Sequence, residues 1–171
     1  NAIICHLGNG ASLCAVRNGS SVFTTMGFTP MDGIMMGTRS GSIDPGIILY
    51  LQKHENFTID QLQELLNENS GLKGICGESD MQEVERRAAI GNSRAVLALE
   101  IYVQKLAFAI SSLFTYYQTI PPIIFTGGIG ENSSLIRQKV CEKLAYAGID
   151  LDLDSNKNGK LDFDFEISSK R

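Results

Sequence analysis

The stretch AIICHLGNGASLCAVRNGSSVFTT, residues 2–25, contains two apolar segments of strand length separated by Gly8-Asn9-Gly10. Asn18-Gly19 follows the second segment, and this dipeptide is a strong hairpin signal because both positions tolerate positive φ. The pattern predicts strands over residues 2–7, 11–17 and 20–25. We therefore expect the chain to begin with a three-stranded antiparallel meander.

The middle of the chain is expected to be a long loop followed by helices. Residues 26–46 hold seven glycines and prolines among methionines and show little periodicity. Long loops inside a compact domain are usually functional. Three signals mark the starts of helices: Pro45, the capping box of Thr58 with Gln61, and a second capping box of Ser79 with Gln82. The second of these helices is expected to end near Gly71 and the third to reach Ile90.

The longest helix is predicted over residues 93–117, capped by Asn92 or Ser93. Steps of three and four join the residues of one apolar seam: Val96, Leu99, Val103, Leu106, Ile110, Leu113 and Tyr117. Smaller and aromatic residues form a second apolar side: Ala95, Ala98, Ile101, Tyr102 and Ala109. Such a helix is packed on two sides, which favours a central core helix; a subunit interface is the alternative.

After this helix, a short buried strand is expected at Ile123–Thr126. It leads into a loop at Gly127–Asn132 and a helix over residues 133–147. Two short strands are predicted beyond it, at Ile149–Leu153 and Leu161–Ile167. The order of elements predicts a mixed α/β domain, flanked by helices, that carries a glycine turn on a hairpin.

Composition limits the classes of function. The 171 residues are 43% hydrophobic and 20% charged, with a net charge of −4, which suits one soluble domain. No basic stripe is present, so we expect no nucleic-acid partner. No uninterrupted apolar run reaches the roughly 20 residues of a spanning helix, so we expect no membrane. The chain begins inside a strand pattern without Met, which we interpret as a fragment. The four cysteines, expected to be reduced, favour a cytoplasmic protein.

Two glycine segments could bind an anion. In His6–Ser12, a tight turn exposes backbone N–H groups, although a plain hairpin and a structural His6 explain the pattern equally well. In Phe125–Asn132, a strand runs through glycines into a helix N-terminus. The second segment has Ser133 where a dinucleotide fingerprint needs glycine, and it lacks the lysine of a Walker loop. Either segment alone indicates only a turn that a ligand can approach.

Arg39 lies in the segment Met35–Gly41, among glycines and methionines with no adjacent acidic residue. A guanidinium in such surroundings suits a bound phosphate or carboxylate. The alternative is an ion pair with Asp32 or Asp44.

Residues 154–162 match the first nine positions of an EF-hand calcium loop. The twelfth position is Phe165 rather than Glu, so we interpret the segment as a solvated acidic turn and reject calcium.

Together, these segments resemble the acetate kinase family of the actin-like kinase superfamily. The resemblance covers nearly all 171 residues and is carried by His6–Ser12, Thr25–Gly33, Met35–Gly41, Ser79–Met81 and Thr126–Asn132. It implies an actin-like, ribonuclease H-like ATPase lobe with a mixed sheet. It also implies that residues 1–171 are a single, incomplete C-terminal nucleotide-binding lobe.

The resemblance implies specific roles. Arg39 would stabilise the transferred phosphoryl group. ATP would be bound by His6, Leu7, Gly8, Asn9, Gly10, Asp80, Met81, Gln82, Gly128, Ile129, Gly130, Glu131 and Asn132. Gln82 stands where the family commonly has Arg, so nucleotide affinity could differ. Mg²⁺ would be a cofactor, with its ligands outside this chain.

By the same resemblance, the enzyme would convert ATP and acetate to ADP and acetyl phosphate, reversibly, as a homodimer. The groups that handle the carboxylate belong to the other lobe, so we expect this chain alone to be inactive. Two alternatives stay open: a propionate kinase, because one methylene gives little discrimination, and a non-catalytic dimerisation or nucleotide-sensing module.

Overall fold

The computed structural model describes residues 1–158 and 166–169. The chain divides into two compact units, and each is treated by itself below. The first unit combines Asn1–Thr24 with Val103–Arg171, and the second is Thr25–Tyr102. The architecture is a mixed sheet with flanking helices, as the sequence predicts.

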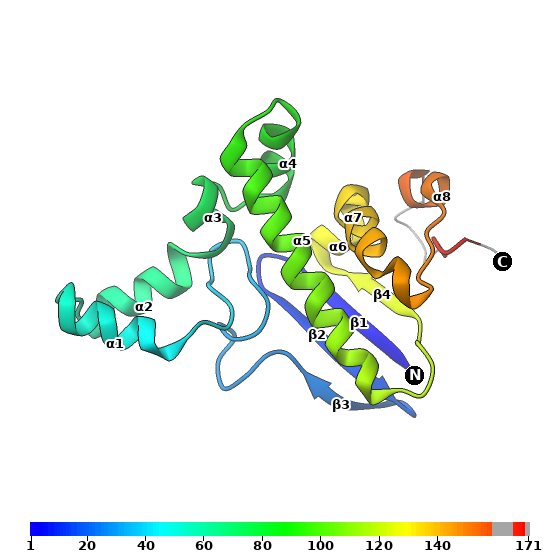
Figure 1. Cartoon of the computed structure of the whole chain (residues 1–171), viewed down its shortest axis with the longest axis horizontal. Helices are drawn as coiled ribbons and strands as arrows, with labels where there is room; N and C mark the ends of the chain where they lie inside the picture. Colours follow the sequence, from blue (N-terminus) through cyan, green and yellow to red (C-terminus); the bar gives the residue numbers. More distant parts are fainter. Residues whose placement is uncertain (159–165, 170–171) are drawn as a thin grey trace. The chain divides into compact units, whose positions relative to one another are not determined.

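The first unit is built on a four-stranded sheet in the order β3-β2-β1-β4 (Figure 1). Its strands are β1 (Ala2–Leu7), β2 (Ala11–Arg17), β3 (Ser20–Thr24) and β4 (Ile123–Thr126). Both pairings of β2, with β1 and with β3, are antiparallel. The predicted meander is therefore confirmed. Because β4 pairs with β1 in parallel, the sheet is mixed.

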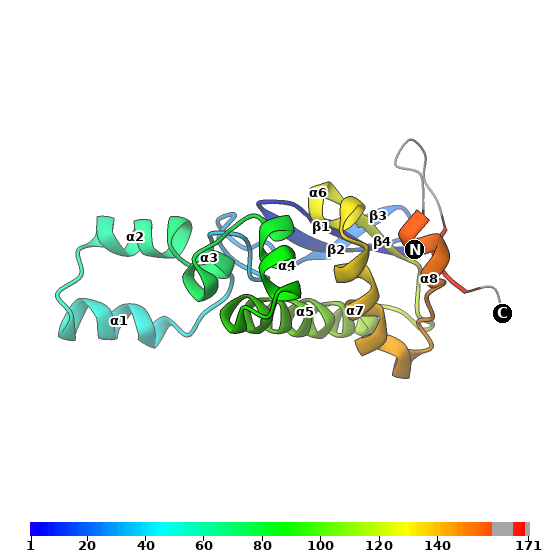
Figure 2. The same cartoon turned by 90° about the horizontal axis from the view of Figure 1, so that it is seen from above.

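One face of this sheet forms the core of the first unit. The register sets Cys5 opposite Leu13, so the odd-numbered residues of both strands share a face. The buried members are Ile3, Cys5 and Leu7 of β1 with Ala11, Leu13 and Ala15 of β2. The second half of α5 (Ser93–Leu113) runs along this sheet (Figures 1 and 2). Its buried residues Val103, Leu106, Ile110 and Leu113 confirm most of the predicted seam.

Helix α5 differs from the prediction in the burial of its first turn and in the position of its C-terminal end. Its first seam residue, Val96, is 37% exposed rather than buried. The helix ends at Leu113, and a 3-10 turn covers Phe114–Tyr116. The Tyr117 hydroxyl donates to the carbonyl oxygens of Ala2 and Val16, at 2.7 and 3.0 Å, so this residue is tied to the strands instead of continuing the helix. The predicted cap is correct at Asn92, whose Oδ1 accepts from the Ala95 N–H.

The span Ser93–Tyr116 is long and apolar enough to cross a membrane, by length and composition alone. No uninterrupted apolar run of that length is present, because isolated charges interrupt the apolar residues, but these charges do not make the helix as a whole polar. A core helix of a globular protein satisfies the same criterion, and the buried seam of α5 is of that kind.

Strand β4 lies at the edge of the described sheet, so it is half-buried and Ile124 is 43% exposed, against the prediction of a buried strand. Residues expected as a glycine loop form a short helix, α6 (Gly127–Asn132). Ser133 then caps α7 (Ser134–Leu144) by accepting from the Ile136 N–H.

The end of the described chain differs from the two predicted strands. A helix, α8 (Leu153–Asn158), follows a single antiparallel bridge between Leu151 and Ser168. A helix forms here because the Asp152 carboxylate accepts from the Ser155 N–H, as the side chain of an N-cap residue does. Most of the second predicted strand, residues 161–165, lies outside the described residues.

The second unit is helical. It contains α1 (Pro45–His54), α2 (Ile59–Glu68), α3 (Gly71–Cys76) and α4 (Met81–Ala89), followed by the first half of α5.

Two of the three predicted helix starts in this unit are correct. Pro45 opens α1, and Thr58 and Gln61 form the capping box of α2. Helix α2 ends at Glu68, slightly before the expected Gly71. The predicted box of Ser79 with Gln82 is wrong, because Asp80 caps α4 by accepting from the Gln82 N–H at 3.1 Å. Asp and Ser are equally good caps, so the position could not be decided from residue type.

Candidate functional site

In the first unit, two of the predicted nucleotide segments lie side by side. Strands β1 and β4 are parallel, with His6 opposite Thr126, so their carboxyl ends meet at one edge of the sheet. The His6 Nδ1 is 3.0 Å from the Thr126 Oγ1. The turn that follows β1 is closed by the Gly8 N–H, which donates to the Gly10 carbonyl at 3.0 Å. The exposed His6 ring is thus held between the two segments.

Gly127 makes the close approach of these segments possible. Its φ is +79°, and a Cβ at this position would lie 2.8 Å from the Leu7 carbonyl oxygen and 3.1 Å from the His6 Cε1. Only glycine combines that dihedral with that contact. Gly128, by contrast, has open space where a Cβ would be, so its backbone is accessible.

Helix α6 begins at this edge with its N-terminus partly occupied. The Glu131 Oε1 accepts from the Gly127 N–H at 2.9 Å, and the Asn132 Nδ2 donates to the Gly128 carbonyl at 2.8 Å. Both side chains fold back along their own helix. A carboxylate at a helix N-terminus is the arrangement that the helix dipole favours, so the anionic position at this turn is filled from within the chain.

Arg137 of α7 holds the C-terminal end of α6 by hydrogen bonds. This residue was not singled out from the sequence. Its side chain is 4% exposed and donates to the carbonyls of Gly130 and Glu131, at 2.9 and 2.7 Å. Its other donors reach the Asn156 Oδ1 and carbonyl, both at 2.7 Å. Burial lowers the pKa of the guanidinium from its usual value. The available signal was an arginine on the apolar stripe that continues at Val140, Cys141 and Leu144.

Asn156 also bears on the rejected calcium loop. It is buried within α8, and its Nδ2 donates to the Ser134 carbonyl. Its side chain is therefore used in packing α8 against α7. Residues 159–162 of the EF-hand match lie outside the described part of the chain.

In the second unit, Arg39 lies in a loop fixed by backbone hydrogen bonds. The Met36 N–H donates to the Arg39 carbonyl, and the Leu72 N–H to the Met36 carbonyl. Gly71 has φ +59°, and a Cβ there would lie 2.2 Å from the Met36 carbonyl oxygen. The loop is thus clamped against the start of α3.

The half-buried Arg39 guanidinium donates from Nη1 to the Pro30 carbonyl at 3.2 Å. Among the described residues it has no ion pair, unlike Arg86 and Arg87. The suggested carboxylate partners are engaged elsewhere. Asp32 accepts from the Ser42 hydroxyl at 2.5 Å and the Gly33 N–H at 2.8 Å, bonds that lower its pKa. Asp44 caps α1. The ion-pair alternative for Arg39 was therefore wrong.

The segment Asp80–Gln82 is held by Glu78, which precedes α4, and by charged groups of α4. Glu78 accepts from the Ser79 and Asp80 N–H groups, which lower its pKa, and also from Arg87 Nη2. Hydrogen bonds from Arg86 and Arg87 lower the pKa of Glu83 to about 2. This network holds the turn that opens α4.

Burial distinguishes how the predicted residues could contact a ligand. Leu7, Met81 and Gly130 are buried, so only their backbone groups could do so. The side chains of His6, Asn9, Asp80, Gln82, Glu131 and Asn132 are exposed. The first unit brings its two segments together, and the second unit holds Arg39 and Asp80–Gln82. That the two segments of the first unit, Arg39 and Asp80–Gln82 all contact the same nucleotide stays a prediction.

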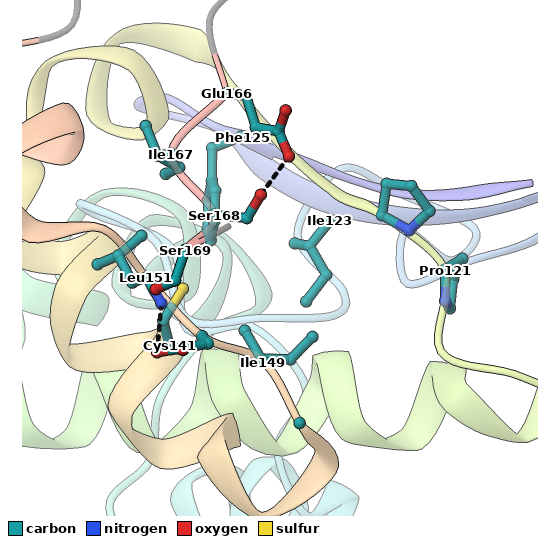
Figure 3. A pocket seen from close by; sticks show the side chains of 13 residues that line it. Pro121, Ile123, Phe125, Cys141, Ile149, Leu151, Glu166, Ile167, Ser168 and Ser169 are labelled. Carbon is teal, nitrogen blue, oxygen red and sulfur yellow. Dashed lines mark hydrogen bonds between the residues drawn. The ribbon is translucent and has the colours of Figure 1, made fainter. Parts of the chain in front are cut away.

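A cavity of about 660 Å³ lies elsewhere in the first unit (Figure 3). It is mainly apolar and is bounded by Ile123 and Phe125 of β4, Cys141 of α7, and Ile149, Leu151 and Ile167. Burial raises the pKa of the Cys141 thiol to about 11, so the thiol is protonated at neutral pH. None of the predicted nucleotide-binding residues lines this cavity.

A metal site is not evident in the part of the chain that the structure describes. No cluster of three His, Cys, Asp or Glu side chains in that part could hold an ion. We therefore assign no magnesium ligand to residues 1–158 or 166–169.

The sheet and its turns define an α/β protein with two glycine segments at the carboxyl ends of neighbouring parallel strands, where such proteins commonly bind ligands. The chain belongs to the acetokinase family, whose model matches residues 1–170.

Individual relatives agree with this family assignment. A protein of Protochlamydia amoebophila named acetate kinase is 53% identical over 165 residues, covering 96% of this chain and 41% of the relative. A Francisella tularensis propionate kinase structure has a TM-score of 0.91 and 45% identity, covering 94% of this chain and 42% of that one. The Porphyromonas gingivalis acetate kinase structure has a TM-score of 0.87 and 35% identity, covering 99% and 41%. The chain thus spans about two fifths of these relatives.

Proposed function

We propose that this chain is the nucleotide-binding, C-terminal lobe of an acetate kinase that transfers a phosphoryl group between ATP and acetate. In the forward direction, a carboxylate oxygen attacks the γ-phosphorus, the bond to the β-phosphate oxygen breaks, and ADP leaves. The relatives named acetate kinase support this assignment.

The observation that carries the proposal is the parallel pairing of β1 with β4. It sets the glycine turn after Leu7 beside the glycines that open α6, and glycines at such turns let an anion approach the backbone closely. In the proposal, residues 6–10 hold the β- and γ-phosphates, and residues 80–82 and 128–132 flank the adenosine. Because the Glu131 carboxylate already satisfies the Gly127 N–H, nucleotide contact there falls on the open face at Gly128.

Arg39 is the proposed catalytic residue. Its guanidinium lacks an ion pair among the described residues, while its backbone is clamped to α3. A charge held this way can stabilise the equatorial oxygens of a phosphoryl group in transfer, where positioning and charge neutralisation dominate.

The proposal extends to the surroundings of the enzyme. ATP and Mg²⁺ are the proposed cofactors, with the metal ligands and the carboxylate-binding groups supplied from outside this chain. The proposed location is the cytoplasm, without a nucleic-acid or membrane partner, and the proposed assembly is a homodimer. Alone, this chain is expected to form no acetyl phosphate in a coupled assay.

The test is Arg39→Ala in the intact enzyme, with the exposed Arg94→Ala as control. We expect kcat to fall by about 100-fold or more while ATP binding, measured by calorimetry, is retained. The control should keep full activity. An unchanged kcat in Arg39→Ala would support the non-catalytic dimerisation or nucleotide-sensing module instead.

A propionate kinase is the second candidate, favoured by the TM-score of 0.91 to the Francisella tularensis enzyme. The difference of one methylene alters binding by only about 1–3 kcal/mol. Comparing kcat/KM for acetate and propionate with the intact enzyme separates the two candidates.

A further inference from the structure

The loop that carries Arg39 is closed at both ends by hydrogen bonds within the second unit. At its tip, the Met36 N–H donates to the Arg39 carbonyl at 3.2 Å. At its base, the Ser42 N–H donates to the Gly33 carbonyl at 2.9 Å, and the Gly33 N–H donates to the Ser42 Oγ at 3.1 Å. A Cβ at Gly41 would lie 2.7 Å from the Gly33 carbonyl oxygen, so the two arms of the loop are in close contact at this end.

The side chain of Asp32 ties these two arms together. Its Oδ1 accepts from the Ser42 hydroxyl at 2.5 Å and from the Gly33 N–H at 2.8 Å. The hydrogen bond from Ser42 is the main cause that lowers the pKa of Asp32, so the carboxylate is charged at neutral pH. Hydrogen bonds to an ionised acceptor are shorter and stronger than neutral ones. We call Asp32, Gly33 and Ser42 the latch.

The latch lies next to the group that accepts from the Arg39 guanidinium. The Arg39 Nη1 donates to the Pro30 carbonyl at 3.2 Å. Pro30 is two residues before Asp32, on the arm that the latch holds, so a movement of this arm would move the acceptor. The backbone after Arg39 is fixed separately, because the Ser40 N–H donates to the Leu66 carbonyl of α2 at 3.0 Å. The latch therefore bears on the direction of the guanidinium more than on the position of its backbone.

This arrangement leaves the positive charge of Arg39 available. In the part of the chain that the structure describes, Asp32 forms no ion pair with Arg39, and its Oδ1 is engaged in the latch. A carboxylate paired with the guanidinium would neutralise the charge that a transferred phosphoryl group requires. A carboxylate that holds the loop instead keeps that charge unspent.

We propose that Asp32 and Ser42 are positioning residues for the phosphoryl transfer: their hydrogen bond fixes the arm that bears the Pro30 carbonyl and thereby aims the Arg39 guanidinium. This inference rests on the proposed function, because it requires that Arg39 stabilise the transferred group. A charge contributes most to catalysis when it is held in place before the reaction begins. Loss of the latch should accordingly lower kcat and leave ATP binding unchanged.

The first experiment uses Ser42→Ala in the intact enzyme. We expect kcat to fall about tenfold, as for the loss of one hydrogen bond to a charged group. The dissociation constant of ATP, measured by calorimetry, should change by less than about twofold. Ser42→Thr keeps the hydroxyl and should retain kcat. The matched control is Ser112→Ala, which removes an exposed hydroxyl that donates to the Ala109 carbonyl of α5 and should alter neither quantity.

Two double variants show whether the latch acts as a unit and through Arg39. Adding Ser42→Ala to Asp32→Ala should lower kcat by less than about twofold, since the acceptor of the hydroxyl is already gone. Adding Ser42→Ala to Arg39→Ala should also lower kcat by less than about twofold, because no guanidinium is left to aim. Circular dichroism checks that every variant keeps its fold.

The outcomes separate this inference from the proposed function. An undiminished kcat in Ser42→Ala overturns the latch alone, as does a tenfold loss that persists in the Arg39→Ala background. A fall in ATP affinity as large as the fall in kcat, or an equal loss of kcat in Ser42→Thr, also overturns it. An unchanged kcat in Arg39→Ala itself overturns the proposed function together with the latch.

Discussion

The His6 Nδ1 and the Thr126 Oγ1, 120 positions apart in the sequence, lie 3.0 Å from each other across the parallel pair β1 and β4. The contact links the two segments proposed to bind ATP and orients the exposed His6 ring at their junction.

Replacing Thr126 by Val removes the hydroxyl that orients His6 and keeps the shape of the side chain. We expect the dissociation constant of ATP to rise about 3- to 10-fold, since one neutral hydrogen bond is worth roughly 1 kcal/mol. Calorimetric titration with ATP measures it. Thr115→Val removes a hydroxyl that, among the described residues, bonds to the Ser112 carbonyl of its own helical turn, and it should not alter affinity. Equal affinities for both variants would contradict a positioning role of Thr126.

Gly127→Ala should destabilise the fold by about 2–4 kcal/mol, because the new Cβ meets the Leu7 carbonyl as well as a left-handed dihedral. Gly19→Ala is the matched control: its φ is +77°, and a Cβ there meets nothing within 4 Å. It should cost only about 1–2 kcal/mol, from the dihedral alone. Urea unfolding compares the two. Equal losses would mean that the close packing of Gly127 against β1 does not increase the cost of adding a Cβ.

Arg137→Met should lower the free energy of unfolding by about 2–4 kcal/mol. It leaves the carbonyls of Gly130 and Glu131 and the side chain of Asn156 without their donor in a buried place. Lys139→Met, on the exposed side of the same helix, should change stability by less than about 0.5 kcal/mol. Chemical denaturation measures both variants. A loss below about 1 kcal/mol for Arg137→Met would show that water replaces the guanidinium.

Glu83 predicts a pH dependence of stability. Its pKa in the folded chain is about 2, against an ordinary value of 4.5, chiefly because Arg86 and Arg87 donate to it. A lowered pKa stabilises the fold above pH 4.5, and this contribution is lost as the pH falls toward 2. Glu83→Gln should therefore be less stable than the wild type at pH 7 and nearly equal at pH 2. Thermal unfolding at both pH values tests this, with Glu100→Gln as control; a pH-independent difference would contradict it.

Local signals were sufficient for much of this fold. Asn18-Gly19 and the alternation of β1 and β2 predicted the meander, and Thr58 with Gln61 predicted the start of α2, because each depends on neighbouring residues. The mixed sheet, by contrast, was reached through the family resemblance. No local pattern indicates which strand pairs with β1 in parallel.

The misses have physical causes. Helix α6 contains three glycines in six residues, which opposes helix formation, and it is stabilised by Glu131 at its start and Arg137 at its end. The cap of α4 is Asp80 rather than the predicted Ser79, because Glu78 accepts from the Ser79 and Asp80 N–H groups. These contacts join residues close in sequence, but residue types alone do not show which of several nearby acceptors takes each backbone N–H group. At the candidate site, composition singled out Arg39, but only coordinates could exclude Asp32 and Asp44 as its partners.

The pairing of β1 with β4 also sets the order in which parts of the sheet can form during synthesis. During synthesis, the meander of residues 2–24 can form long before residues 123–126 leave the ribosome, whereas the fourth strand must close a loop of more than 100 residues to reach its place. The junction of His6 with Thr126 should accordingly be among the last parts of the first unit to mature. A nascent chain halted before β4 would carry an unprotected strand edge on β1, a template for unwanted association until translation resumes.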